Sequence, residues 1–233
     1  MKTILKHDVF GTVSRLSASA DDIGDTECDA LDIHNTDCII RDYSNARLIW
    51  RFLARYLARR ERDALSYLND VNGIPRLIDY NNRRLIRSFL AGAPMHIARP
   101  KSSHYFKSAA KLLRTLHRHN VTHNDLAKEP NWLVLDDGNA GLIDFQLARH
   151  HRKRSAWFRL SAREDLRHLL KHKCNYRPDL LTNREQAILA TPAWPARVWR
   201  VTVKPIYLFI TRRLMGWADR EGAGDRSDIQ SKP

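Results

Sequence analysis

Five polar residues near the middle of the sequence have types and spacing that could support phosphoryl transfer. His123-Asn124-Asp125 is followed by Asn131, and Asp144 comes after two apolar runs. In phosphoryl transfer one carboxylate orients the attacking hydroxyl and accepts its proton, while an amide and a second carboxylate hold Mg²⁺ on the nucleotide phosphates. Oxygen ligands of this kind suit Mg²⁺. The set therefore favours an Mg²⁺-dependent reaction on a phosphorylated substrate.

The elements around this set are expected to place it at the ends of a β-hairpin. Residues 132–135 and 140–143 are apolar runs, and the turn between them contains an Asp-Gly pair. Residues 105–117, before the set, have the apolar spacing of a helix. The order of helix, polar loop, hairpin and Asp144 is more specific than any one of these motifs.

The N-terminal part of the chain is predicted to contain short strands and one long helix. Strand-like runs lie at 8–16 and 37–41, and two more lie at 76–80 and 84–90. Between these pairs, residues 46–68 have helical periodicity. We therefore expect a β-rich region with a single helix before the polar set.

The predicted helix 46–68 has one arginine face and one apolar face. The arginine face comprises Arg47, Arg51, Arg55, Arg59 and Arg62, and the apolar face comprises Ile49, Phe52, Leu53, Tyr56 and Leu57. Glu61 lies at the border of the apolar face. Its carboxylate should point along the packing surface, so it needs a partner.

Turn-forming residues at 91–94 mark a boundary between two regions. We divide the chain into residues 1–90, residues 91–220 with the polar set, and a polar, glycine-containing tail at 221–233 that is expected to be flexible. The region from about 161 to 218 is predicted to be mostly helical.

With Asp144-Phe145-Gln146 standing where many kinases have Asp-Phe-Gly, the chain resembles the protein-kinase-like superfamily. Within it, the chain is similar to small bacterial proteins grouped with RIO-type and lipopolysaccharide-core sugar kinases, often labelled serine/threonine kinases. The resemblance implies a bilobal α+β fold: a small antiparallel β-rich N-lobe with one long helix, a mainly helical C-lobe, and ATP between them. It also implies that residues 1–90 are the N-lobe and residues 91–220 the C-lobe.

The same resemblance implies a role for individual residues. Asp125 corresponds to the catalytic aspartate, Asn131 and Asp144 correspond to the Mg²⁺ ligands, and Glu61 corresponds to the helix glutamate that pairs with a basic strand residue. Asp165 resembles an aspartate that braces the catalytic loop, although a surface acid among arginines would look the same.

Three features depart from the superfamily pattern. Asp125 and Asn131 are six positions apart, where five are usual. The strand lysine that contacts the nucleotide phosphates is missing, and Arg41 is the candidate in its place. Arginine keeps the charge but presents a planar fork rather than a compact ammonium. The glycine-rich loop is reduced to Gly11, and a single glycine is more often an ordinary turn residue.

Lys128, three residues after Asp125, is the second candidate catalytic residue. We expect it to reach the transferred phosphate and stabilise its charge, as the missing strand lysine otherwise would. A surface lysine beside Glu129 is an equally good explanation of the same sequence.

The chain carries a net charge of +14 over 233 residues, and this charge is unevenly distributed. Residues 1–45 have a net charge of −5, so the remainder carries +19, concentrated at 47–62 and 149–173. Such surfaces attract polyanions. We expect an anionic acceptor, either a phosphorylated glycan such as a lipopolysaccharide core sugar or the serine or threonine of a protein.

An alternative function remains open because of Arg41 and the single glycine. In this alternative the chain is a catalytically weak or inactive kinase-like module that engages RNA or an anionic membrane through its basic C-lobe. A purely nucleic-acid-binding protein is disfavoured, because no nucleic-acid-binding motif accompanies the charge.

The sequence also favours a cytoplasmic location, including peripheral contact with the inner face of the membrane. Three widely spaced cysteines indicate a reducing compartment rather than a disulfide framework. The first residues do not resemble a signal peptide, and no run approaches the ~20 apolar residues of a membrane span.

Overall fold

The computed structural model describes residues 2–8, 11–16, 37–44, 48–81 and 83–191. Within these residues the protein is a mixed α+β structure with antiparallel sheets. The predicted tail and residues 192–218 of the predicted C-terminal helical region lie outside the described residues.

The chain divides into two compact units, residues 1–181 and 182–233. The predicted boundary near residue 90 falls inside the first unit and stays a prediction. In the second unit, α5 (Asn183–Ala190) begins with a capping box, in which the Thr182 hydroxyl accepts from the backbone N–H of Glu185 and the Glu185 carboxylate accepts from the backbone N–H of Thr182.

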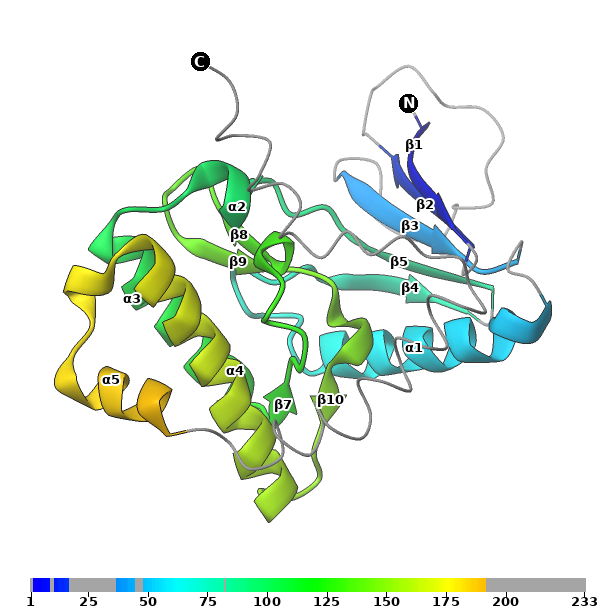
Figure 1. The fold of residues 1–233 in the computed structure, drawn as a ribbon. Helices are drawn as coiled ribbons and strands as arrows, with labels where there is room; N and C mark the ends of the chain where they lie inside the picture. Colours follow the sequence, from blue (N-terminus) through cyan, green and yellow to red (C-terminus); the bar gives the residue numbers. More distant parts are fainter. Residues whose placement is uncertain (1, 9–10, 17–36, 45–47, 82, 192–233) are drawn as a thin grey trace. The chain divides into compact units, whose positions relative to one another are not determined.

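A five-stranded antiparallel sheet forms the N-terminal part of the first unit (Figure 1). Its strands, in the spatial order β1-β2-β3-β5-β4, are β1 (Lys2–Asp8), β2 (Gly11–Leu16), β3 (Cys38–Asp42), β5 (Arg84–Ser88) and β4 (Leu77–Tyr80). The predicted strands at 37–41, 76–80 and 84–90 are confirmed. The predicted strand over 8–16 is confirmed over 11–16 as β2, which pairs with β3. Only its beginning differs, because Asp8 ends a separate strand, β1, and lies opposite Gly11.

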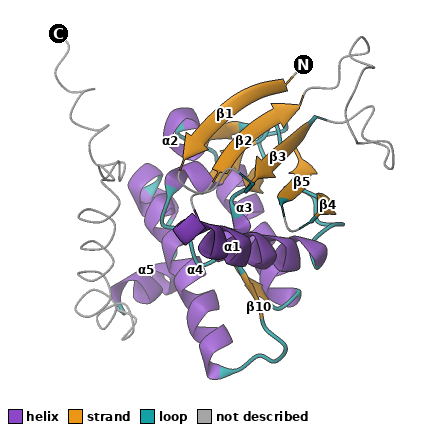
Figure 2. Cartoon of the chain, turned by 90° about the vertical axis from the view of Figure 1, so that its right-hand side faces the viewer, coloured by secondary structure: helices purple, strands orange, loops and turns teal. Residues whose placement is uncertain are grey.

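Helix α1 (Leu48–Ser66) lies along one face of this sheet (Figures 1 and 2). Ala54 and Ala58, one turn apart, are buried against Leu85 of β5 and Tyr43. Small side chains at these positions allow the helix backbone to approach the sheet closely. This approach brings Glu61, one turn further along the same side, down to the sheet.

The apolar face predicted for α1 is not its packing face. Phe52 is 79% exposed, Tyr56 55% and Leu53 39%, whereas the alanines, Glu61, Leu65 and Leu68 are buried. The prediction was wrong because the wheel weighted large apolar side chains, while the close contact with the sheet selects small ones. Ile49 lies outside the side chains that the structure describes.

The rest of the first unit contains two larger helices and short antiparallel ribbons. The elements are β6 (Ala93–Pro94), α2 (Met95–Ala98), α3 (Ser103–Arg118), β7 (Val121–Thr122), β8 (Trp132–Val134), β9 (Ala140–Leu142), β10 (Arg149–His150) and α4 (Ala156–Tyr176), with 3₁₀ helices η2 (Glu129–Asn131), η3 (Phe145–Leu147) and η4 (Pro178–Leu180). The predicted helix at 105–117 and the predicted hairpin are confirmed as α3 and β8–β9. Together with the C-terminal end of α1, these elements enclose the main core around Leu113, Leu116 and Trp132.

None of the helices in the described part of the chain combines the length and the apolar character needed to cross a membrane.

Candidate active site

The loop that carries Asp125 is fixed through its backbone. It follows β7, and the N–H groups of His123 and Asn124 each donate to the carboxylate of Asp165 at 2.9 Å. Asp165 is buried on α4, and the ring of His117 on α3 approaches the same carboxylate at 3.3 Å. Hydrogen bonds to a buried carboxylate are among the stronger ones in proteins. The position of Asp125 is therefore set by two helices.

His123 connects this loop with the segment that carries Asp144. Its imidazole is fully buried, its Nε2 lies 3.1 Å from the carbonyl oxygen of Ile143, and its ring packs against Phe145 at 4.7 Å between centroids. The contacts flank Asp144 on both sides. Asp144 itself has a left-handed backbone, with φ of 64°, which is uncommon outside glycine and clusters at functional sites.

The carboxylate of Asp125 is surrounded by hydrogen-bond donors. The amide nitrogen of Asn131 donates to the Asp125 backbone carbonyl at 2.9 Å and to its Oδ2 at 3.0 Å. The ammonium of Lys128 donates to the same Oδ2 at 2.9 Å. Asn131 and Lys128 thus both donate to the same carboxylate oxygen of Asp125.

The segment between Asp125 and the hairpin contains η2, which ends at Asn131. The loop is pinned on both sides of Lys128: the carbonyl of Leu126 accepts from the His172 ring at 2.8 Å, and the carboxylate of Glu129 accepts from the Tyr176 hydroxyl at 2.7 Å. Both donors lie on α4. The longer spacing therefore does not remove Asn131 from Asp125.

Three elements of the structure meet at Arg41. Its guanidinium lies 3.4 Å from the Glu61 carboxylate on α1 and 3.6 Å from the Asp144 carboxylate. Glu61, which is fully buried, has a second partner in Arg87 of β5, at 3.3 Å. Glu61 is thus paired with Arg41, the partner that the sequence analysis predicted. Arg87 is a second partner, which the sequence analysis did not predict.

The charges of this group lower the pKa of Asp144. Burial alone would raise it, but the positive charges of Arg41, Arg87 and Lys128 outweigh burial and hold the pKa below its ordinary value. Burial lowers the pKa of Arg87, and Glu61 opposes that effect. Asp144 is therefore an anion at neutral pH.

The donor set fits Mg²⁺ bound together with a phosphorylated ligand. In the part of the chain that is described, no three His, Cys, Asp or Glu residues form a complete metal site. However, Asp144 Oδ1 is buried and has no hydrogen-bond partner. The backbone carbonyl of Asn131 accepts from the N–H of Ile143, the residue before Asp144, at 3.0 Å. Mg²⁺ is commonly held by one or two protein groups together with substrate phosphates.

For Gly11, the structure gives only its place in the sheet. It begins β2 opposite Asp8, and residues 9 and 10 beside it lie outside the described residues. Its predicted role in binding phosphates stays a prediction.

Two further residues hold the segment after Asp144, in contacts that the sequence analysis did not predict. Arg60, the neighbour of Glu61 on α1, donates to the carbonyl of Leu147 at 2.7 Å and to that of Ala148 at 3.1 Å. The Asn124 amide also donates to the Leu147 carbonyl, at 2.9 Å. Two adjacent residues of α1 thus contact different parts of the site: Arg60 binds the segment after Asp144, and Glu61 pairs with the arginines of the sheet.

Comparisons with protein-family models and with curated proteins found no match to this chain.

Proposed function

We propose that the chain is an ATP-dependent phosphotransferase of the protein-kinase-like superfamily, with a bilobal fold. Residues 1–90 are the N-lobe and residues 91–220 the C-lobe. The observation that carries the proposal is the position of Arg41, which is within ion-pairing distance of both Glu61 and Asp144. In this position Arg41, a cation on β3, lies beside Asp144, an anion that is suited to bind a metal ion. Nucleotide phosphates are commonly bound by such a combination of a basic side chain and a metal ion.

The residues have separate roles in this reaction. Asp125 orients the acceptor hydroxyl and takes its proton as the oxygen attacks the γ-phosphorus and the bond to ADP breaks. Lys128 and Asn131 hold the Asp125 carboxylate in place. Arg41 contacts the phosphates, and Glu61 orients Arg41. Asp144 and the amide oxygen of Asn131 hold Mg²⁺, which supplies neutralising charge on the phosphates when bound.

The acceptor in this proposal is anionic. Arg149, Arg152 and Lys153 are exposed and follow Asp144 closely in the chain. They offer positive charge to a phosphorylated glycan or to a protein segment that carries the acceptor hydroxyl.

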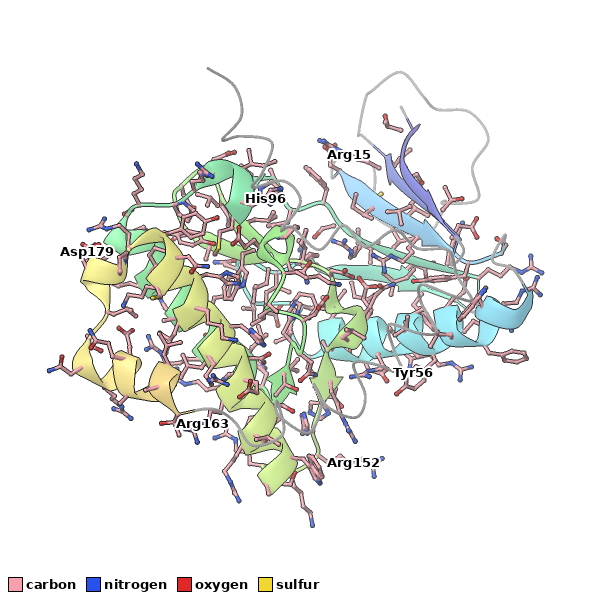
Figure 3. The ribbon with its side chains drawn as sticks, viewed as in Figure 1. Arg15, Tyr56, His96, Arg152, Arg163 and Asp179 are labelled. Carbon is pink, nitrogen blue, oxygen red and sulfur yellow. The ribbon has the colours of Figure 1, made fainter. Side chains whose placement is uncertain are left out.

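Mg²⁺-dependent ATP consumption by the purified chain tests the proposal. We expect turnover in the wild type, and its loss in Asp125→Ala and in Asp144→Ala. Asp179→Ala is the matched control, because Asp179 is an exposed aspartate of η4 outside the site (Figure 3). Equal turnover in all four proteins, or none in the wild type with and without candidate acceptors, would contradict the proposal and favour the non-catalytic kinase-like module.

A further inference from the structure

The exposed side of α1 has no role in the site described above. We define the aromatic–arginine face as Phe52, Leu53, Tyr56, Arg51, Arg55 and Arg59. Its aromatic residues follow the i, i+4 spacing of one helix side, opposite the buried Ala54 and Ala58. Figure 3 shows Tyr56 on the side of α1 that faces away from β4 and β5.

We propose that the aromatic–arginine face binds the surface of an anionic phospholipid membrane. This inference does not rest on the proposed function. A helix that carries exposed aromatic and aliphatic residues beside arginines is suited to lie in the membrane interface, with its apolar side chains at the boundary between headgroups and acyl chains.

The charges of the face identify the partner as anionic. Arg51, Arg55 and Arg59 have no carboxylate partner among the described residues. The nearby acids are already paired: Glu61 is buried with Arg41 and Arg87, and Asp63 pairs with Arg62. Arg59 is exposed, whereas Arg51 and Arg55 are half-buried and Arg51 donates to the carbonyl of Ser44 at 3.5 Å. Arginine binds phosphate through paired hydrogen bonds, so the three residues contribute positive charge suited to an anionic surface.

The apolar content of the face favours a lipid layer over a folded protein. A stable protein interface takes roughly 800 Å² from each partner and about 20 residues. Three apolar side chains on one convex helix supply much less than this. Insertion into a lipid interface needs only a few such side chains, provided that basic residues lie beside them.

Sedimentation of the full chain with lipid vesicles tests the proposal. We expect binding to vesicles of phosphatidylcholine mixed with phosphatidylglycerol, weak binding to phosphatidylcholine alone, and a loss of binding as salt is added. Absence of binding to the mixed vesicles would overturn the proposal and point to a protein partner for this face.

Substitutions separate the apolar contact from simple charge attraction. The double variant Phe52→Ser/Tyr56→Ser should weaken binding to the mixed vesicles by about tenfold or more, because the inserted groups are lost. Its unfolding midpoint should stay at the wild-type value, because both side chains are largely exposed. Trp157→Ser, which removes a 72% exposed aromatic from α4, is the matched control and should bind like the wild type.

The arginines provide a second, independent measurement. Arg51→Gln/Arg55→Gln/Arg59→Gln should bind more weakly and with a flatter dependence on salt. Wild-type binding by the aromatic double variant would show that the membrane is held elsewhere in the chain. An equal loss in Trp157→Ser would show that the contact is not specific to α1. Either result overturns the proposal.

Discussion

The two halves of the candidate site are held together in different ways. Around Asp125 the contacts are hydrogen bonds of 2.9–3.0 Å, from Asn131, Lys128 and the backbone bonds to Asp165. Around Arg41 they are ion pairs of 3.3–3.6 Å, and neither oxygen of Glu61 has a hydrogen-bond partner.

In the proposed function, this difference separates a preorganised half from a half that a nucleotide completes. A loop fixed by short hydrogen bonds keeps one geometry before substrate arrives, which suits the role proposed for Asp125 as proton acceptor. In the longer ion pairs the charged groups lie near one another, and the distances between them can shorten when a nucleotide binds. The four predictions below test this distinction through stability and activity, from the largest expected effect on stability to the smallest.

Replacement of Glu61 by glutamine should have the largest effect on stability. The change leaves Arg41 and Arg87 close together without their shared anion, so we expect the free energy of unfolding to fall by about 3–5 kcal/mol. Urea denaturation measures it. Asp63→Asn on the exposed side of α1 is the control, and an equal, small effect in both variants would contradict the ion-paired arrangement.

Replacement of Asp165 by asparagine should have the next largest effect. One backbone N–H of the Asp125 loop then faces an amide nitrogen instead of an oxygen, and the remaining hydrogen bond loses its charge. We expect the free energy of unfolding to fall by about 2–3 kcal/mol in the same assay. We also expect turnover to fall, because the Asp125 loop loses part of its support. Glu164→Gln on the same helix is the control. Unchanged turnover in Asp165→Asn would show that the loop keeps its geometry without the brace.

The lowered pKa of Asp144 should appear in the pH dependence of stability. A carboxylate with a lowered native pKa adds stability that is fully present above its unfolded pKa, about 4, and that is lost as the pH falls through the native value. The difference in unfolding free energy between the wild type and Asp144→Asn should therefore shrink below about pH 4. A difference that stays constant down to acid pH would contradict the assigned charge interactions.

Replacement of Lys128 by alanine should affect stability least. The side chain is 61% exposed and its ion pair with Asp125 is local, so we expect less than about 1 kcal/mol. If Lys128 stabilises charge on the transferred phosphate, activity should fall by about tenfold or more. Turnover and urea denaturation together check this. Lys111→Ala, on the exposed side of α3, is the control, and full activity in Lys128→Ala would leave Lys128 as a surface residue.

Local patterns in the sequence predicted the elements well. The Asp-Gly turn between apolar runs located the β8–β9 hairpin, and helical periodicity located α1 and α3. The contact of Arg41 with Glu61 was expected from the resemblance and from the need of a buried carboxylate for a partner.

Arg87 could not be found in this way, because its role depends on long-range register. It lies opposite Ile39, so it shares a face with Arg41 only once β3 and β5 are paired. The one available signal was an arginine beside apolar residues in a strand. The packing side of α1 was also missed, since the close approach to the sheet depends on Ala54 and Ala58 rather than on the larger apolar residues.

Titration calorimetry of Mg²⁺-ATP binding tests the division between the two halves most directly. The wild type should bind ATP in an Mg²⁺-dependent manner. Asp125→Asn should bind with nearly the same affinity, because that half serves the chemical step. Asp144→Asn and Arg41→Gln should lose about tenfold or more in affinity, because charge-assisted contacts to the phosphates are removed. No binding by the wild type, or an equal loss in all three variants, would contradict the account.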